Sequence, residues 1–113
     1  MKIAIPTDNK NGLNDKVAEH FGRAKNFLVY DTEKKSSEIF ENPEVVGTGE
    51  FPPDFLNRQK IEAVIVFSLG PMAYNKFQNF RIEMHKAIQG SIADNLKKFE
   101  AGELGKLRKE DIF

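Results

Sequence analysis

A five-residue segment combines side chains that bind metal ions and anions. Residues 19–23 read EHFGR, so an imidazole, an aromatic ring, a flexible glycine and a guanidinium group lie close together in the chain. A neutral imidazole is a common metal ligand, and a guanidinium group donates paired hydrogen bonds to oxyanions. His20 and Arg23 are therefore candidates for binding an anion that contains a metal. A plainer interpretation stays open, in which His20 caps the end of an element and Arg23 forms a surface ion pair.

Two other polar segments follow predicted strands. Residues 7–9 (TDN) close a first strand, and residues 68–71 (SLGP) follow a central strand. In sheets with parallel strands, ligands collect beyond the carboxyl ends of the strands. If these two strands are neighbours, both segments converge with residues 19–23, and their backbone N–H groups form a rim able to hold an anion. Residues 85–91 are a third candidate segment, although a half-exposed strand normally ends in a polar residue such as His85.

Asp8 suggests a competing function, because an aspartate after a first strand can hold magnesium for phosphoryl transfer. The other carboxylates that such a site needs are not in the right places. Glu62 precedes the central strand, and the carboxyl end of that strand offers Ser68 and no acid. The Gly70-Pro71 turn lacks the spaced glycines and the lysine of a phosphate-binding loop. Since no convincing nucleophile or acid–base pair is present either, we expect a protein that is not an enzyme.

The composition limits the class of protein. A chain of 113 residues suits one domain, and its 17 basic and 17 acidic side chains cancel, which argues against nucleic acid and anionic membranes as partners. The absence of cysteine excludes disulfides and the usual thiolate ligands of zinc and iron–sulfur clusters. The first residues lack the apolar stretch of a signal peptide, and no later run is long enough to span a membrane. We therefore expect a cytoplasmic protein.

The hydrophobic pattern predicts an α/β fold with the element order β-β-β-α-β-α-β-α. A hairpin comes early in the chain, and two strand–helix–strand units follow, which implies right-handed parallel crossovers and a mixed sheet. The continuous apolar run at residues 63–67 predicts a central strand covered on both faces. The predicted strands lie at 3–5, 27–30, 37–41, 63–67 and 81–85, and the predicted helices start near Pro53, Pro71 and Ser91.

Two segments fall outside these elements. Residues 10–25 are rich in Asn, Gly, Asp and Lys, so we expect a long loop that is too polar to pack and is mobile without ligand. Residues 105–113 carry many charges, so we expect a loosely attached tail.

Several motifs in this order resemble the dinitrogenase iron-molybdenum cofactor biosynthesis family, whose members are NifX-like. They are residues 1–8 (MKIAIPTD), 19–24 (EHFGRA), Phe27, 69–73 (LGPMA) and 101–104 (AGEL). The resemblance runs from residue 1 to 104 and leaves 105–113 as a charged C-terminal tail. It implies a ribonuclease H-like three-layer fold, with a five-stranded mixed sheet flanked by helices and without a nuclease site. It also implies that His20 is a metal ligand surrounded by Phe21, Gly22 and Arg23.

The first hypothesis is therefore a non-enzymatic carrier or binding protein for an anionic iron-sulfur or iron-molybdenum type cofactor. Its partners would be the metal-sulfur cofactor and a cofactor-assembly or recipient protein, with no nucleic acid and no membrane. The alternative is a protein-interaction or small-anion-binding module without metal, in which the histidine is incidental. The expected cofactor-binding residues are Asp8, His20, Phe21, Gly22, Arg23, Leu69, Gly70 and Pro71, with His20 as the metal ligand.

Overall fold

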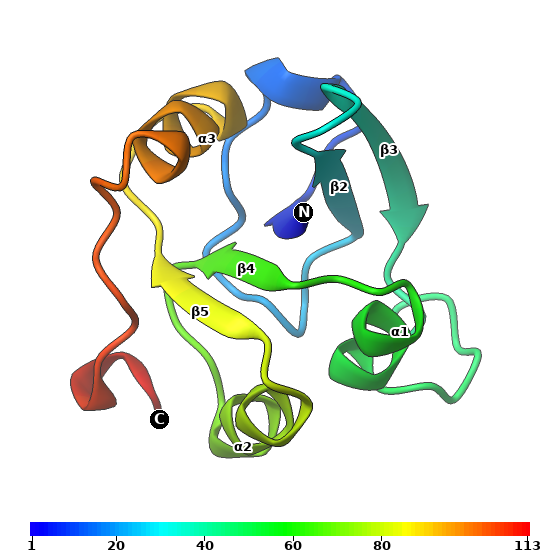
Figure 1. Cartoon of the computed structure of the whole chain (residues 1–113). Helices are drawn as coiled ribbons and strands as arrows, with labels where there is room; N and C mark the ends of the chain where they lie inside the picture. Colours follow the sequence, from blue (N-terminus) through cyan, green and yellow to red (C-terminus); the bar gives the residue numbers. More distant parts are fainter.

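The computed structural model describes residues 1–113 and contains one five-stranded sheet with three α-helices (Figure 1). The strands are β1 (Lys2–Thr7), β2 (Asn26–Asp31), β3 (Ser36–Glu41), β4 (Ala63–Val66) and β5 (Glu83–Lys86). The helices are α1 (Pro52–Arg58), α2 (Pro71–Phe80) and α3 (Ile92–Glu100), and short 3-10 helices lie at Gly12–Asn14 and Lys109–Asp111. This order confirms the predicted sequence of elements.

The sheet is mixed, as predicted. Its strand order is β3-β2-β1-β4-β5; β1, β2 and β3 run antiparallel, and β1, β4 and β5 run parallel. Strands β1 and β4 are therefore neighbours, which is the condition for their carboxyl ends to share one edge of the sheet. The edge strand β3 exposes Glu38 and Glu41, and such charges discourage pairing with another chain.

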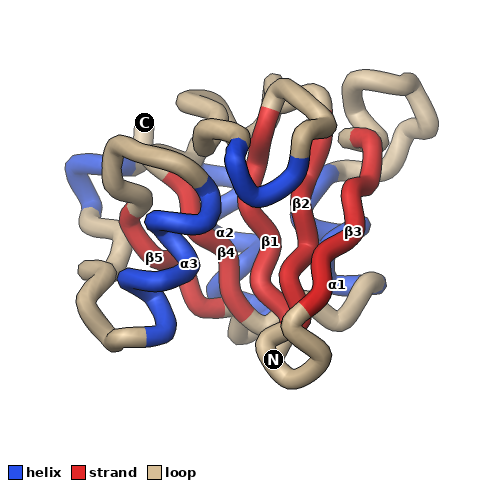
Figure 2. The backbone as a smooth tube through the Cα atoms, turned by 90° about the horizontal axis from the view of Figure 1, so that it is seen from above, coloured by secondary structure: helices blue, strands red, loops and turns tan.

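Helices cover both faces of the sheet and make three layers. One core contains Val64 and Val66 of β4 and packs against α1 and α2, whereas the other contains Ile65 and packs against α3. Figure 2 shows α3 on one side of the sheet and α1 and α2 on the other. All four residues of β4 are fully buried, which explains why its sequence is apolar without alternation.

The helix ends follow local rules. Ser91 Oγ accepts a hydrogen bond from the Asp94 N–H at 3.0 Å, and Asp94 Oδ2 accepts one from the Ser91 N–H at 3.2 Å, so the predicted capping box begins α3. Helix α2 begins at Pro71 and ends before Arg81, whose φ of 59° is left-handed. None of the helices is long and apolar enough to cross a membrane.

The expectation that residues 10–25 are too polar to pack is wrong. Val17, Ala18, Phe21 and Ala24 are all buried, and the Ala18 N–H donates to the Pro6 carbonyl at 2.8 Å. The segment is polar on average, but these four apolar side chains are buried and anchor it, whereas Leu13 stays exposed. Its mobility without ligand remains a prediction.

The expectation of a loosely attached tail is also wrong. The Lys86 N–H donates to Gly105 O at 2.8 Å, and the Leu107 N–H donates to Met84 O at 3.1 Å, so the segment runs beside β5. An ion pair of 2.6 Å joins Lys86 to the buried Asp111. Hydrogen bonds and this ion pair attach residues 105–113 to the domain. The charged composition of the segment did not predict this attachment.

Candidate functional site

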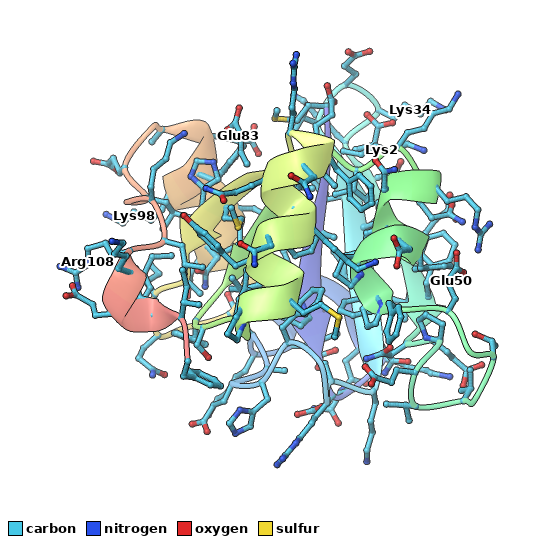
Figure 3. All side chains as sticks on the ribbon, turned by 90° about the horizontal axis from the view of Figure 1, so that it is seen from below. Lys2, Lys34, Glu50, Glu83, Lys98 and Arg108 are labelled. Carbon is cyan, nitrogen blue, oxygen red and sulfur yellow. The ribbon has the colours of Figure 1, made fainter.

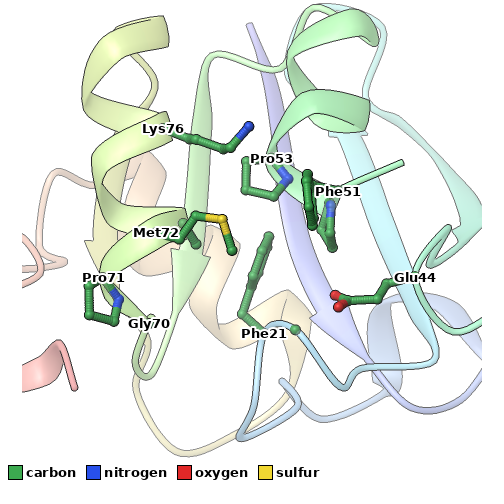
Figure 4. A pocket seen from close by; sticks show the side chains of 11 residues that line it. Phe21, Glu44, Phe51, Pro53, Gly70, Pro71, Met72 and Lys76 are labelled. Carbon is green, nitrogen blue, oxygen red and sulfur yellow. The ribbon is translucent and has the colours of Figure 1, made fainter. Parts of the chain in front are cut away.

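Two of the predicted binding segments, residues 19–23 and 68–71, meet beyond the carboxyl ends of β1 and β4, around two adjoining depressions. We call the more polar one the His20 basin; its volume is about 280 Å³ and its lining is His20, Phe21, Gly22, Arg23, Ser68, Leu69, Gly70 and Phe113. The other, the apolar cleft, has a volume of about 300 Å³ and is lined by Phe21, Gly22, Glu44, Phe51, Pro52, Pro53, Gly70, Pro71, Met72, Ala73 and Lys76 (Figure 4). Phe21, Gly22 and Gly70 line both depressions, so the two form one continuous surface.

His20 and Arg23 present free side chains to this surface. Both residues are exposed, and none of the ion pairs of the chain involves either of them. The surface ion pair that was the plainer interpretation of Arg23 is therefore not formed. An exposed guanidinium group without a carboxylate partner is available to an incoming anion.

Phe21 anchors the loop that carries these two side chains. It is 5% exposed, and its ring centroid lies 5.1 Å from that of Phe27 and 5.4 Å from that of Phe77. In Figure 4, Phe21 lies between Met72 and Phe51, at the floor of the apolar cleft. Phe21 is thus mainly an anchor for the loop, and its buried ring leaves His20 and Gly22 on the outside.

Asn42 supports the same loop through its buried side chain, although no sequence motif singles it out. Its side chain is fully buried, and Nδ2 donates to the carbonyls of Ala24 at 2.8 Å and Gly22 at 3.3 Å. The Asn42 N–H also donates to Lys25 O at 2.9 Å. The only signal in the sequence is a polar residue between a predicted edge strand and Pro43, and that pattern is equally typical of a turn.

Asp8 lies beside the basin in a smaller depression that Glu19, His20 and Arg23 also line. Its Oδ1 accepts a hydrogen bond from the Lys25 N–H at 3.2 Å, so it helps to close the loop. No group of three His, Asp or Glu side chains in the chain could hold a metal ion. Asp8 therefore lies near the predicted site, but it does not form a set of metal ligands with its neighbours.

The predicted rim of amides is smaller than expected. The side chain of Leu69 is buried, and its N–H already donates to Asp111 O at 3.1 Å. Pro71 has no N–H and lies in the apolar cleft, outside the basin. Of these three residues, Gly70 alone keeps an N–H for an anion.

His85 lies away from the basin. Its side chain is 12% exposed, Nε2 lies 2.9 Å from Glu83 Oε1, and the ring meets that of Phe99 edge-on with centroids 4.8 Å apart. No residue of 85–91 lines the His20 basin or the apolar cleft. Ser68 and Phe113 do line the basin, and no sequence signal placed Phe113 there.

Ion pairs border the apolar cleft. Lys76 Nζ lies 2.8 Å from Asp54 Oδ2 and 5.2 Å from the centroid of the Phe51 ring. Arg58 donates to Glu50, and this hydrogen bond is the main reason why the pKa of Glu50 is below its ordinary value. Of the two charged side chains that line the cleft, Lys76 is paired with Asp54, and Glu44 forms no ion pair.

Comparisons with known proteins identify the family of this chain. A family model described as dinitrogenase iron-molybdenum cofactor matches residues 1–102. The chain belongs to the dinitrogenase iron-molybdenum cofactor family. The protein MJ0580 of Methanocaldococcus jannaschii is 34% identical over 112 residues, which cover 94% of this chain and 91% of that protein.

Solved structures resemble this member of the dinitrogenase iron-molybdenum cofactor family over almost its whole length. The crystal structure of PH0822 has a TM-score of 0.80 at 28% identity and covers 96% of this chain and 98% of that one. The apo form of the orange protein from Desulfovibrio gigas has a TM-score of 0.83, covering 94% of this chain and 92% of that one. At 20% identity, the second likeness shows the fold alone.

The donor groups in the basin suit an anionic metal cluster better than a bare metal ion. A bare ion such as zinc needs about four protein donors, and this member of the dinitrogenase iron-molybdenum cofactor family offers one imidazole and no thiolate at the basin. An anionic cluster carries its own sulfide ligands, so it leaves fewer metal positions for the protein to fill than a bare ion does. The basin offers one imidazole, one guanidinium group and the Gly70 N–H, from His20, Arg23 and Gly70.

Proposed function

We propose that this chain is a non-enzymatic carrier or binding protein for an anionic iron-sulfur or iron-molybdenum type cofactor. The observation that carries the proposal is the His20 basin, where a free imidazole and a free guanidinium group line one depression beyond β1 and β4. Membership of the dinitrogenase iron-molybdenum cofactor family supports this chemical class of ligand. In the proposal, His20 ligates a metal of the cluster, and Arg23 and the Gly70 N–H compensate its negative charge.

The proposal includes the setting of the protein. We infer that it works in the cytoplasm and exchanges its ligand with a cofactor-assembly or recipient protein, without nucleic acid or membrane. The net charge of zero supports the last point, because binding to either polyanion usually needs an excess of basic residues. We also infer that the fold is ribonuclease H-like, on the basis of the β3-β2-β1-β4-β5 strand order.

Anaerobic cofactor uptake tests the proposal. The apo protein is incubated with isolated iron-molybdenum cofactor and passed through a sizing column, and the protein peak is assayed for iron and molybdenum. We expect both metals in the peak of the wild type and at least a tenfold loss of metal for His20→Ala, because the substitution removes the only imidazole of the basin.

The matched control is His85→Gln, which changes the only other histidine, outside the basin. We expect this variant to take up cofactor as the wild type does, once both are compared at equal folded fraction by circular dichroism. A metal-free peak for the wild type would overturn the carrier function. Equal uptake by His20→Ala would remove His20 as the metal ligand.

A second candidate function is the interaction or small-anion module without metal. The apolar cleft favours it, because Phe51 and Met72 next to the basin are 47% and 57% exposed. In this case inorganic phosphate should shift the backbone amide resonances of Gly70 and Gly22 in an NMR titration, while the sizing-column peak stays free of metal. Metal uptake that depends on His20 would exclude this candidate.

A further inference from the structure

The segment after residue 104 reaches the ligand surface by pairing with the β4–α2 connection. The Leu69 N–H donates to Asp111 O at 3.1 Å, the Phe113 N–H donates to Leu69 O at 3.2 Å, and Leu69 and Ile112 form a parallel bridge. Figure 1 shows this red segment ending beside the start of α2. It lies beyond residues 1–102, which the family model matches.

An ion pair between the partly exposed Lys86 and the buried Asp111 helps to hold the segment in place. Asp111 is 8% exposed; its Oδ1 lies 2.6 Å from Lys86 Nζ, and its Oδ2 accepts the Arg108 N–H at 2.9 Å. Lys86 Nζ also donates to Phe67 O at 2.8 Å, so this lysine connects β5, the end of β4 and the segment. Because the Asp111 carboxylate is buried, removing Lys86 would leave it poorly compensated, which is unfavourable.

The pairing places an aromatic side chain at the His20 basin. Phe113 lines the basin together with His20, Gly22, Arg23 and Ser68. It is 71% exposed, more than any other large apolar side chain of the chain, although its backbone is held by Leu69. A ligand in the basin would cover part of this ring, and burial of aromatic surface favours binding.

We propose that Phe113 is a ligand-contacting wall of the His20 basin and that Lys86 positions it through Asp111. This inference rests on the proposed cofactor-binding function. It assigns the segment 105–113 a part in the affinity of the site, in addition to any role in stability. Phe113 contacts the ligand, and Lys86 and Asp111 act only through Phe113.

The first test measures the affinity for isolated iron-molybdenum cofactor. We expect Phe113→Ala to weaken binding by about fivefold to tenfold, in line with the loss of part of an aromatic contact, and Phe113→Leu to keep most of the affinity. Lys86→Met should weaken binding to the same degree. The double variant Lys86→Met/Phe113→Ala should bind no worse than either single variant, because both remove the same contact.

The second test needs no ligand. Hydrogen exchange of the apo protein should show faster exchange of the Leu69 and Phe113 amides in Lys86→Met, since the ion pair that holds their hydrogen-bonded segment is lost. Lys98→Met is the matched control, because it breaks the exposed pair of Lys98 and Glu103 at 3.5 Å, which does not hold residues 109–113. Lys98 points outward from the ribbon (Figure 3).

The outcomes separate this inference from the proposed function. Normal affinity of both Phe113→Ala and Lys86→Met would overturn this inference and leave the carrier function intact. Tighter binding by either variant would also overturn it, because the segment would then cover the basin. No binding by the wild type would overturn both. Additive losses in the double variant, or unchanged exchange at Leu69 in Lys86→Met, would remove Lys86 as the positioning residue.

Discussion

At the scale of single residues, the binding surface depends on the division of roles within residues 20–23. Phe21 is buried in the core, whereas His20 and Arg23 on either side of it are exposed and unpaired. A buried anchor next to two free polar groups limits the positions that these groups can take, so less order has to be created when a ligand binds.

Arg23→Ala should reduce cofactor uptake by about tenfold, because it removes the free positive charge of the basin, and a charge-assisted hydrogen bond contributes roughly 1.5–3 kcal/mol. Lys25→Ala is the control, since it removes an exposed positive charge two residues away that does not line the basin. The measurement is the dissociation constant at two salt concentrations. Equal losses in the two variants would show that general charge, and no specific contact, attracts the ligand.

Asn42→Ala should lower the free energy of unfolding by about 1–3 kcal/mol, because it leaves the buried carbonyl of Ala24 and the partly buried carbonyl of Gly22 without their donor. The exposed Asn57→Ala on α1 is the matched control and should change stability by less than about 0.5 kcal/mol. Urea unfolding followed by circular dichroism measures both. If the two variants unfold at the same midpoint, Asn42 does not support the loop as proposed.

At the scale of elements, the connection between β4 and α2 has two structural roles. Pro71 begins α2, and the preceding Leu69 pairs its backbone with residues 111–113. The neighbouring β5 supplies Lys86, whose ion pair with Asp111 secures that pairing. The edge of the sheet at this end is therefore extended by a segment that is distant in the sequence.

The docking of residues 109–113 should depend on pH. The hydrogen bond from Lys86, and after it the one from the Arg108 N–H, lower the pKa of Asp111 below its ordinary value. Because the folded carboxyl has the lower pKa, its stabilising effect is present above the unfolded pKa of about 3.9 and is lost as the pH falls through the folded value.

We therefore expect the amide of Leu69 to stay protected from hydrogen exchange from neutral pH down to about pH 4, after correction for the intrinsic rate, and to lose protection at lower pH. In Asp111→Asn, the Leu69 amide should already lack protection from hydrogen exchange at neutral pH. Protection that is independent of pH in the wild type would mean that the backbone bonds alone hold the segment.

At the scale of the whole molecule, two cores on opposite faces of one sheet stabilise the chain, and only one of them reaches the site. Phe77 of α2 belongs to the core that contains Phe21, whereas Leu96 of α3 belongs to the other core. Both side chains are buried, so their truncation leaves cavities of similar kind.

Phe77→Ala should destabilise the protein by about 3–5 kcal/mol and Leu96→Ala by about 2–5 kcal/mol, and each should unfold in one transition because the chain is a small domain. Under native conditions, Phe77→Ala alone should also weaken cofactor binding, since its ring contacts that of Phe21 at 5.4 Å. Chemical denaturation and cofactor titration measure the two effects. Similar affinity of the two folded variants would contradict the proposed link between this core and the basin.

The sequence by itself determined the element order, the mixed sheet, the capping box at Ser91 and the family. These features depend on short-range patterns: apolar runs such as residues 63–66, prolines at helix starts, and motifs such as residues 19–24. Even within them, β5 begins at Glu83 and not at Arg81, because Arg81 adopts a left-handed conformation and Ile82 donates to Phe77 O.

Only the tertiary structure decided how the site is completed. The burial of Phe21, the support by Asn42, the use of the Leu69 N–H by Asp111 and the place of Phe113 all depend on contacts between residues far apart in the chain. Local propensity does not predict such contacts. A charged segment or a single asparagine has the same local sequence whether its side chains face solvent or bind another part of the chain.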